Sequence, residues 1–412
     1  MKTLKGFISQ LDEEKNVHME HIEDLIFNEG VEGTRKAINF LRDLRDMLAG
    51  HSTSKVTATV KWDGAPAVFA GVDPTDGKFF VAKKGVFNKN PKVYKTTAEV
   101  DADTQGDLAT KLKIALAEFS KLGIKSGVFQ GDLMFTSADL KTETVEDQKY
   151  TTFHPNTIVY AVPYESDLAK RIRKAKIGVV WHTTYTGNSF ETMKAEFGKP
   201  IVTHMTSIPS VWMDDANYKD YSGTATFTEA ETKHVTEMLS EIGKLFNQIP
   251  AATINAISHD PDLLILVKTY NNSKVREGQK INPKQHVDGL FQWIYDRFQK
   301  EIETKKTEKG KSAQEEKRKK ILAFFANHPK EDIIKIFQLS NMIADVKMPI
   351  IAKMNQAGHI STFVKTSNGF KVTGVEGFVA IDHLKGGAVK IVDRMEFSRN
   401  NFSAEIVKGW QR

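Results

Sequence analysis

Residues 56–72 read VTATVKWDGAPAVFAGV, and this stretch decides the fold class expected for the 412-residue chain. Two short runs rich in Val, Ala, Thr and Phe flank the tetrapeptide Lys61-Trp62-Asp63-Gly64, a pattern typical of two strands joined by a turn. In an extended segment Lys61 and Asp63 project from the same face, and Gly64 allows the backbone to approach a bulky ligand. The stretch therefore predicts β-structure with a lysine and a carboxylate where the first strand ends.

Similar strand-like runs continue along the chain, separated by turn residues. They are 79–87, 127–135, 157–164, 177–185, 369–382 and 387–397. A helical pattern at 107–122 interrupts them once. Because the strands do not alternate regularly with helices, we expect an α+β fold with an antiparallel or mixed sheet, rather than a βαβ fold.

Two other parts of the chain have helical periodicity. Residues 19–50 carry apolar side chains at three- and four-residue spacing, and Thr228 with Glu231 predicts a capping box before a stripe that stops at Pro250. The charge-dense segment 305–320 is predicted to be a solvated helix or linker rather than a nucleic-acid-binding element, because its glutamates dilute its lysines. We divide the chain as follows: an N-terminal helical segment 1–54, a β-rich domain in two parts, 55–204 and 358–412, and a helical insertion 205–357.

Composition excludes several kinds of site. The chain has no cysteine, so a disulfide scaffold, a disulfide-linked partner, a thiolate metal site and a cysteine nucleophile are all excluded. Its 12 histidines show no metal-binding spacing, and His182 and His383 are predicted to be structural. There is no signal-peptide pattern and no apolar run of about 18 residues, which predicts a soluble cytoplasmic protein without a membrane partner. The net charge of +6 is only mild evidence for an anionic partner.

Charged and aromatic residues recur at apolar positions of the predicted strands. They are Lys83 and Lys84, Asp132, Tyr160, Glu376 and Lys390. Burial of a lysine or a carboxylate is costly unless the group faces a ligand or an opposite charge. A lysine amine can attack the α-phosphorus of a nucleoside triphosphate when a divalent metal neutralises the phosphates. The series therefore predicts a nucleotide pocket around Lys61.

In its order along the chain, this series resembles the covalent nucleotidyltransferase superfamily of ATP-dependent DNA and RNA ligases and GTP-dependent capping enzymes. Within the resemblance, Lys61 matches the nucleophile that becomes lysyl-AMP, and Asp63 and Gly64 complete its motif. Lys84 resembles the basic residue near the ribose and phosphates, with Lys83 as the alternative. The implied fold is an ATP-grasp-like adenylation domain, here interrupted by the helical insertion.

The later motifs match in the same order. Asp132 resembles the acid that contacts the ribose or organises metal-bound water, and Tyr160 the aromatic that stacks on the base. Glu376 resembles the metal-associated carboxylate, so Asp132 and Glu376 are the implied metal ligands. Lys390 resembles the lysine that holds the α-phosphate, with Lys385 as a distant second candidate.

The resemblance implies ATP and Mg²⁺ (or Mn²⁺) as cofactors and RNA or DNA ends as partners. The short tail after Lys390 leaves no room for the OB domain of DNA ligases and capping enzymes, whereas RNA ligases can carry helical modules instead, so RNA ligase is favoured. Thr59 stands where many DNA ligases have a glutamate that reads adenine, which leaves GTP open. The terminal VDRMEFSRNNF resembles ligase-like proteins of large tailed bacteriophages. The alternatives are a DNA ligase, a guanylyltransferase, or a non-catalytic nucleic-acid-binding phage protein.

Overall fold

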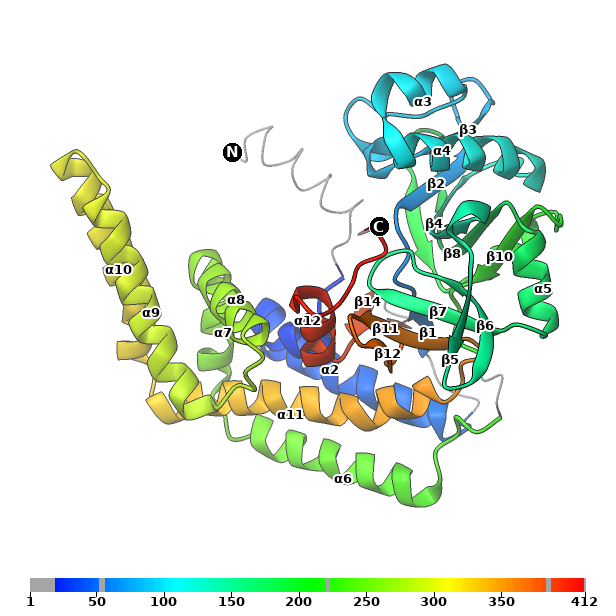
Figure 1. The fold of residues 1–412 in the computed structure, drawn as a ribbon. Helices are drawn as coiled ribbons and strands as arrows, with labels where there is room; N and C mark the ends of the chain where they lie inside the picture. Colours follow the sequence, from blue (N-terminus) through cyan, green and yellow to red (C-terminus); the bar gives the residue numbers. More distant parts are fainter. Residues whose placement is uncertain (1–18, 52–55, 220–222, 383–386, 411–412) are drawn as a thin grey trace.

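The computed structural model describes residues 19–51, 56–219, 223–382 and 387–410. It has a mixed α+β fold with three mainly antiparallel sheets on one side and long helices on the other (Figure 1). The smallest sheet has the order β1–β13–β14 and positions the candidate site. Its strands are β1 (Val56–Lys61), β13 (Gly377–Asp382) and β14 (Ala388–Ile391).

The largest sheet has the order β10–β8–β4–β2–β3, with β9 paired to β8. Its strands are β2 (Ala67–Val72), β3 (Phe79–Ala82), β4 (Val128–Thr136), β8 (Ile177–Thr186), β9 (Lys194–Phe197) and β10 (Val211–Asp215). Helix α4 (Gly106–Phe119), preceded by α3 (Thr97–Asp103), covers one face of this sheet. Phe119 of α4 packs on Trp181 of β8, so the apolar stripe of the helix closes this core.

The third sheet has the order β12–β11–β7–β6–β5. Its strands are β5 (Lys141–Val145), β6 (Gln148–Phe153), β7 (Ile158–Pro163), β11 (Ser361–Thr366) and β12 (Gly369–Val372), and α5 (Asp167–Lys174) packs beside β6 and β7. Strand β11 pairs with β7 although the long helices lie between them in the sequence. The chain thus returns to the β-rich part after the helices.

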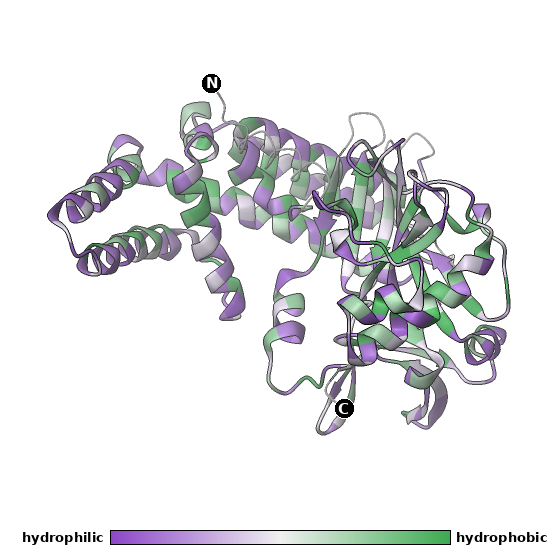
Figure 2. Ribbon diagram, turned by 90° about the horizontal axis from the view of Figure 1, so that it is seen from above, coloured by the Kyte–Doolittle hydropathy of each residue, from purple (hydrophilic) through white to green (hydrophobic). Residues whose placement is uncertain are grey.

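The remaining helices lie below the sheets and to one side of them (Figure 1). They are α2 (Leu25–Leu48), α6 (Glu229–Phe246), α7 (Ala251–His259), α8 (Pro261–Arg276), α9 (Pro283–Glu303), α10 (Glu308–Asn327), α11 (Lys330–Asn355) and α12 (Arg394–Phe402). Most of their apolar faces share one buried cluster with Phe378 of β13 and Ile391 of β14. The helices therefore support the sheet that carries the candidate site. The helices that extend furthest from the strands have mainly hydrophilic outer faces (Figure 2).

The structure confirms the α+β class with antiparallel sheets, and it confirms the capping box of Thr228 and Glu231 at the start of α6. The expectation of strand structure throughout 387–397 is wrong. Strand β14 ends at Ile391, and Asp393 accepts hydrogen bonds from the main-chain N–H groups of Met395 and Glu396, which begins α12.

The predicted helical insertion starts differently from the expectation. Residues 211–215 form β10 of the largest sheet, and the long helices begin only at residue 229. His383 and Lys385 lie outside the described residues. In the part of the chain that the structure describes, no helix is long and apolar enough to cross a membrane.

Candidate functional site

A cavity of about 370 Å³ lies where the three-stranded sheet meets the largest sheet. Seven of the nine predicted site residues line it: Lys61, Asp63, Gly64, Lys84, Asp132, Glu376 and Lys390. They come from distant parts of the chain, since Lys61 and Lys390 belong to the first and the last of the described strands. The fold therefore brings most of the ordered series together, while Lys83 and Tyr160 lie elsewhere.

Lys61 and Glu376 meet across two strands. Lys61 is the last residue of β1 and pairs with Gly377, the first residue of β13, so Glu376 lies just beyond the strand end. The Nζ atom of Lys61 forms an ion pair with Oε1 of Glu376. The side chain of Lys61 is 30% exposed and that of Glu376 is 10% exposed, so the amine remains open to a ligand while its partner is largely buried.

Asp63 anchors the turn that follows β1. Its carboxylate accepts hydrogen bonds from Asn156 Nδ2 (2.6 Å) and from the main-chain N–H groups of Thr157 (2.6 Å) and Ile158 (2.8 Å). Burial raises the pKa of Asp63, and these three donors oppose that shift. Asp63 thus fixes the turn that follows Lys61 to the start of β7.

Tyr160 lies in the core between two aromatic rings. It is 1% exposed and stacks on Trp62 and Phe153, with ring centroids 5.1 and 5.3 Å apart. Its hydroxyl accepts a hydrogen bond of 2.7 Å from the main-chain N–H of Asp63. Tyr160 therefore supports the Lys61 turn from behind and does not line the cavity.

Gly64 makes the approach of this turn to β4 possible. A Cβ atom on Gly64 would lie 2.5 Å from the Cβ of Asp132 and 3.0 Å from the main-chain oxygen of Leu133. Ala65 also donates a main-chain hydrogen bond of 3.0 Å to that oxygen. Glycine is required here because two backbones pack together, which also sets Asp132 beside Lys61.

Two carboxylates in the cavity are hard to ionise. Burial raises the pKa of both Asp132 and Glu376 to about 7, with Lys61 opposing the shift in each case and Asp63 adding to it. Carboxylates with such pKa values are typical of sites that bind a cation or transfer a proton. The described residues hold no group of three or more Asp, Glu or His side chains arranged to bind a metal alone.

The two adjacent lysines separate at the end of β3. Lys84 begins a single 3₁₀ turn, η2 (Lys84–Phe87), and its side chain lines the cavity. Lys83 instead forms an ion pair of 3.0 Å with Asp103 of α3. The turn that follows β3, whose start the sequence alone does not define, places Lys84 rather than Lys83 in the cavity.

Lys390 lines the cavity from β14, opposite Val379 of β13. Burial lowers its pKa, and the nearby charge of Lys61 adds to that shift. Two lysines in one cavity repel each other unless anionic groups lie between them. The pair is therefore suited to an anion such as a phosphate.

Sequence reasoning missed several residues that line the cavity. His182, predicted to be structural, projects from β8 with Nε2 3.9 Å from Oδ2 of Asp132, and Phe197, Gln130 and Thr59 lie on the walls as well. Burial lowers the pKa of His182 to about 4, so its ring is neutral near pH 7. Strand alternation could have identified His182 from the sequence. Trp181 is fully buried, so the side chain of His182, the next residue of β8, faces the opposite side of the sheet.

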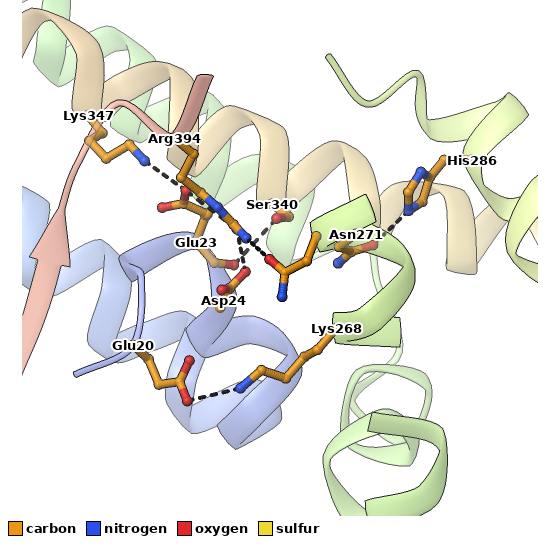
Figure 3. Close-up of polar contacts among 10 residues, drawn as sticks. Glu20, Glu23, Asp24, Lys268, Asn271, His286, Ser340, Lys347 and Arg394 are labelled. Carbon is orange, nitrogen blue, oxygen red and sulfur yellow. Dashed lines mark hydrogen bonds and ion pairs between the residues drawn. The ribbon is translucent and has the colours of Figure 1, made fainter. Parts of the chain in front are cut away.

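An N-terminal segment closes the cavity beside Lys390. Met19 lines the cavity, and the main-chain N–H of Lys390 donates a hydrogen bond of 2.8 Å to the main-chain oxygen of Glu20. The Glu20 carboxylate in turn forms an ion pair of 2.9 Å with Lys268 of α8 (Figure 3). The backbone of Lys390 is thereby linked to the helices.

A buried group of charges holds this segment in place (Figure 3). Glu23 forms an ion pair of 2.7 Å with Lys347 of α11, and both side chains are at most 5% exposed. Arg394, at the start of α12, forms an ion pair of 2.9 Å with Asp24. Burial acts to raise the pKa of Glu23, but the cation of Lys347 and its neighbours outweigh that effect and lower it to about 2.

A model of the family described as "Family of unknown function (DUF6267)" matches residues 16–406, which is nearly the whole chain. The chain belongs to DUF6267. No curated protein and no solved structure matches it. The match spans the three sheets and the helices alike, so the DUF6267 family model covers the cavity together with the helices below it.

Proposed function

We propose that this DUF6267 protein is a nucleotidyltransferase that forms a covalent lysyl-AMP at Lys61 and uses it to join polynucleotide ends. The observation that carries the proposal is the cavity that gathers Lys61, Glu376, Asp132, Lys84 and Lys390. A lysine nucleophile, two carboxylates and two further cations are the groups that adenylylation requires. On this proposal the sheets form an adenylation domain and the long helices an insertion within it.

The first step forms a bond between Lys61 Nζ and the α-phosphorus of ATP. The bond from that phosphorus to the pyrophosphate oxygen breaks, and pyrophosphate leaves. Lys61 must first lose a proton, and its ion-pair partner Glu376, with a pKa raised to about 7, is placed to accept it. Lys390 and Lys84 bind the phosphate oxygens and stabilise the charge that develops on them.

Asp132 and Glu376 suit a divalent cation that is shared with the nucleotide. Mg²⁺ is commonly bound by one or two carboxylates together with substrate phosphates, so two carboxylates can be sufficient. Bound there, Mg²⁺ or Mn²⁺ would neutralise phosphate charge. The pKa values of both carboxylates are raised, and a bound divalent cation would favour their ionised forms.

The base would lie against the walls that His182 and Phe197 provide, because Tyr160 is buried in the core. The later steps transfer AMP from Lys61 to a 5′-phosphate, after which a 3′-hydroxyl attacks that phosphate and releases AMP. RNA is favoured over DNA as the substrate, because the long helices between β10 and β11 match the helical modules that the resemblance associates with RNA ligases.

Incubation with α-labelled ATP and Mg²⁺, followed by denaturing electrophoresis, tests the proposal. We expect label on the wild-type protein and none on Lys61→Ala. Lys83→Gln is the matched control, since it changes a neighbouring lysine that pairs with Asp103 outside the cavity, and it should keep the label. A wild-type protein that takes no label from any nucleoside triphosphate would overturn the proposal and leave a non-catalytic binding protein.

One residue of the cavity leaves GTP open as a second nucleotide substrate. Thr59 lines the cavity two residues before Lys61, and its hydroxyl can both donate and accept a hydrogen bond. It therefore does not exclude guanine, so the same assay is run with α-labelled GTP. Label from GTP alone would indicate a guanylyltransferase.

A further inference from the structure

Positive charge is concentrated in one short part of the chain. Residues 297–320 contain ten Lys and Arg against five Glu, a net charge of +5, whereas all 412 residues carry +6. The rest of the chain is therefore almost neutral. Such an asymmetry indicates a local anionic partner more strongly than the total charge does.

This charge lies on the hairpin formed by α9 and α10, which extends away from the sheets (Figures 1 and 2). The two helices bury many of their apolar side chains, among them Ile294, Phe298 and Ile302 of α9 and Ile321 and Phe324 of α10, whereas Phe291 and Tyr295 of α9 are exposed. With 21 residues, α9 is about 30 Å long. The hairpin thus carries its charges well beyond the body of the protein.

The tip of the hairpin, residues 300–309, contains four lysines and three glutamates, and two of these glutamates form ion pairs with cations outside the tip. Arg297 pairs with Glu301 and Lys311 with Glu308. At the tip, residues 300–309, the described contacts include no ion pair for four exposed lysines. These are Lys300, Lys305, Lys306 and Lys309. These four cations are therefore free to meet an external anion.

We propose that the tip of the α9–α10 hairpin binds the phosphate backbone of a polynucleotide. Exposed lysines that form no ion pair among the described contacts can approach phosphates, and they gain affinity by releasing the counterions of a nucleic acid. An anionic membrane is the poorer partner for the tip, because a helix that lies on a membrane needs an exposed apolar face. Ile302, the one large apolar residue of the tip, is buried, and the exposed Phe291 and Tyr295 of α9 lie outside the tip. The claim that this polynucleotide accepts AMP from Lys61 rests on the proposed function. The claim that it binds to the tip does not depend on the proposed function.

The test compares two variants with the same change in net charge. In the tip variant, Lys300, Lys305, Lys306 and Lys309 are all replaced by Gln, which retains helix propensity. In the control variant, Gln replaces four exposed lysines on other elements: Lys170, Lys199, Lys233 and Lys244. Fluorescence anisotropy measures binding of a 5′-phosphorylated RNA oligonucleotide, and of the same sequence as DNA, at several salt concentrations.

We expect the tip variant to bind the oligonucleotides at least about tenfold more weakly than the wild type. The slope of the logarithm of the binding constant against the logarithm of the salt concentration should become less steep by about 3, because four phosphate contacts are lost at about 0.7 each. The control variant should change neither value by as much. Equal losses in both variants, or an unchanged slope in the tip variant, would overturn the proposal. Co-sedimentation with phosphatidylserine vesicles is measured in parallel, and a tip variant that binds both oligonucleotides normally but loses binding to the vesicles would also overturn the proposal.

Labelling with ATP separates this proposal from the proposed function. The tip variant should form the covalent intermediate at the wild-type rate, since the tip is not part of the cavity. If the wild type forms no intermediate, the anisotropy result still decides whether the tip binds nucleic acid. If labelling succeeds and the tip variant binds RNA and DNA normally, only the hairpin proposal fails.

Discussion

The main-chain N–H of Lys390 donates a 2.8 Å hydrogen bond to the main-chain oxygen of Glu20, which joins the N-terminal segment to the last strand beside the cavity. The segment that contains Glu20 is held by cations from three helices: Lys268 of α8, Lys347 of α11 and Arg394 of α12. The position of Lys390 therefore depends on charges that lie outside the cavity.

Glu23→Gln should strongly destabilise the protein, because it leaves Lys347 charged and buried without its partner. Loss of one member of a buried ion pair costs roughly 3–5 kcal/mol of unfolding free energy. The pKa of Glu23 is lowered from about 4.5 to about 2, so this stabilisation is present above pH 4.5 and is lost as the pH falls toward 2. Chemical denaturation of the wild type and the variant at pH 7 and at pH 3 measures it. Lys280→Gln, at an exposed ion pair with Asp345, is the control and should change stability by less than about 1 kcal/mol.

Asp132→Asn should stabilise the ligand-free protein at pH 8 and have little effect near pH 4. Folding raises the pKa of Asp132 to about 7 from about 3.8, so the wild type loses stability as the pH rises between these values. We expect a gain on the order of 1–3 kcal/mol at pH 8. Thermal unfolding followed across pH measures the difference. A variant that is equally stabilised at both pH values would contradict a raised pKa.

Gly64→Ala should abolish labelling by ATP and lower stability by about 1–3 kcal/mol, because the new Cβ would lie 2.5 Å from that of Asp132. The turn that carries Lys61 would have to move away from β4. Gly243→Ala is the matched control, since a Cβ at this position of α6 meets no atom within 4 Å. It should leave labelling intact and raise stability by up to about 1 kcal/mol.

His182→Ala should raise the ATP concentration needed for half-maximal labelling, whereas His182→Phe, which retains a flat ring, should raise it less. Tyr160→Phe should leave that concentration unchanged but cost about 1–3 kcal/mol of stability, because the buried N–H of Asp63 loses its acceptor. Initial labelling rates over a range of ATP concentrations, together with denaturation curves, measure both. The reverse pattern would place the base against Tyr160.

The parts of the fold that could be predicted from sequence are those with a continuous local pattern. The stripe before Pro250 and the apolar run of β4 are examples, since period 3.6 or a dense apolar run is visible within one segment. Strand β5 was missed because its sequence KTETV is almost wholly polar. Helix α12 was missed because RMEFSRNNF has no apolar stripe and depends on a cap at Asp393.

The cavity was predictable in part for a different reason. Lys61, Asp132 and Glu376 could be found because charged residues at apolar strand positions are conspicuous one at a time. The choice of Lys84 over Lys83 depends on where the turn after β3 begins. The placement of His182, rather than Tyr160, in the cavity depends on the pairing of distant strands. Those relationships are set by tertiary packing, which no single segment encodes.

The pairing of β1 with β13 also has a consequence for synthesis on the ribosome. Lys61 is made well before Gly377 and Lys390, and the delay between them is about 15–60 s at typical elongation rates. During that time the amine has neither its carboxylate partner nor the second lysine. The ion pair of Lys61 with Glu376 and the pairing of Lys390 beside it therefore form only after β13 and β14 have left the ribosome.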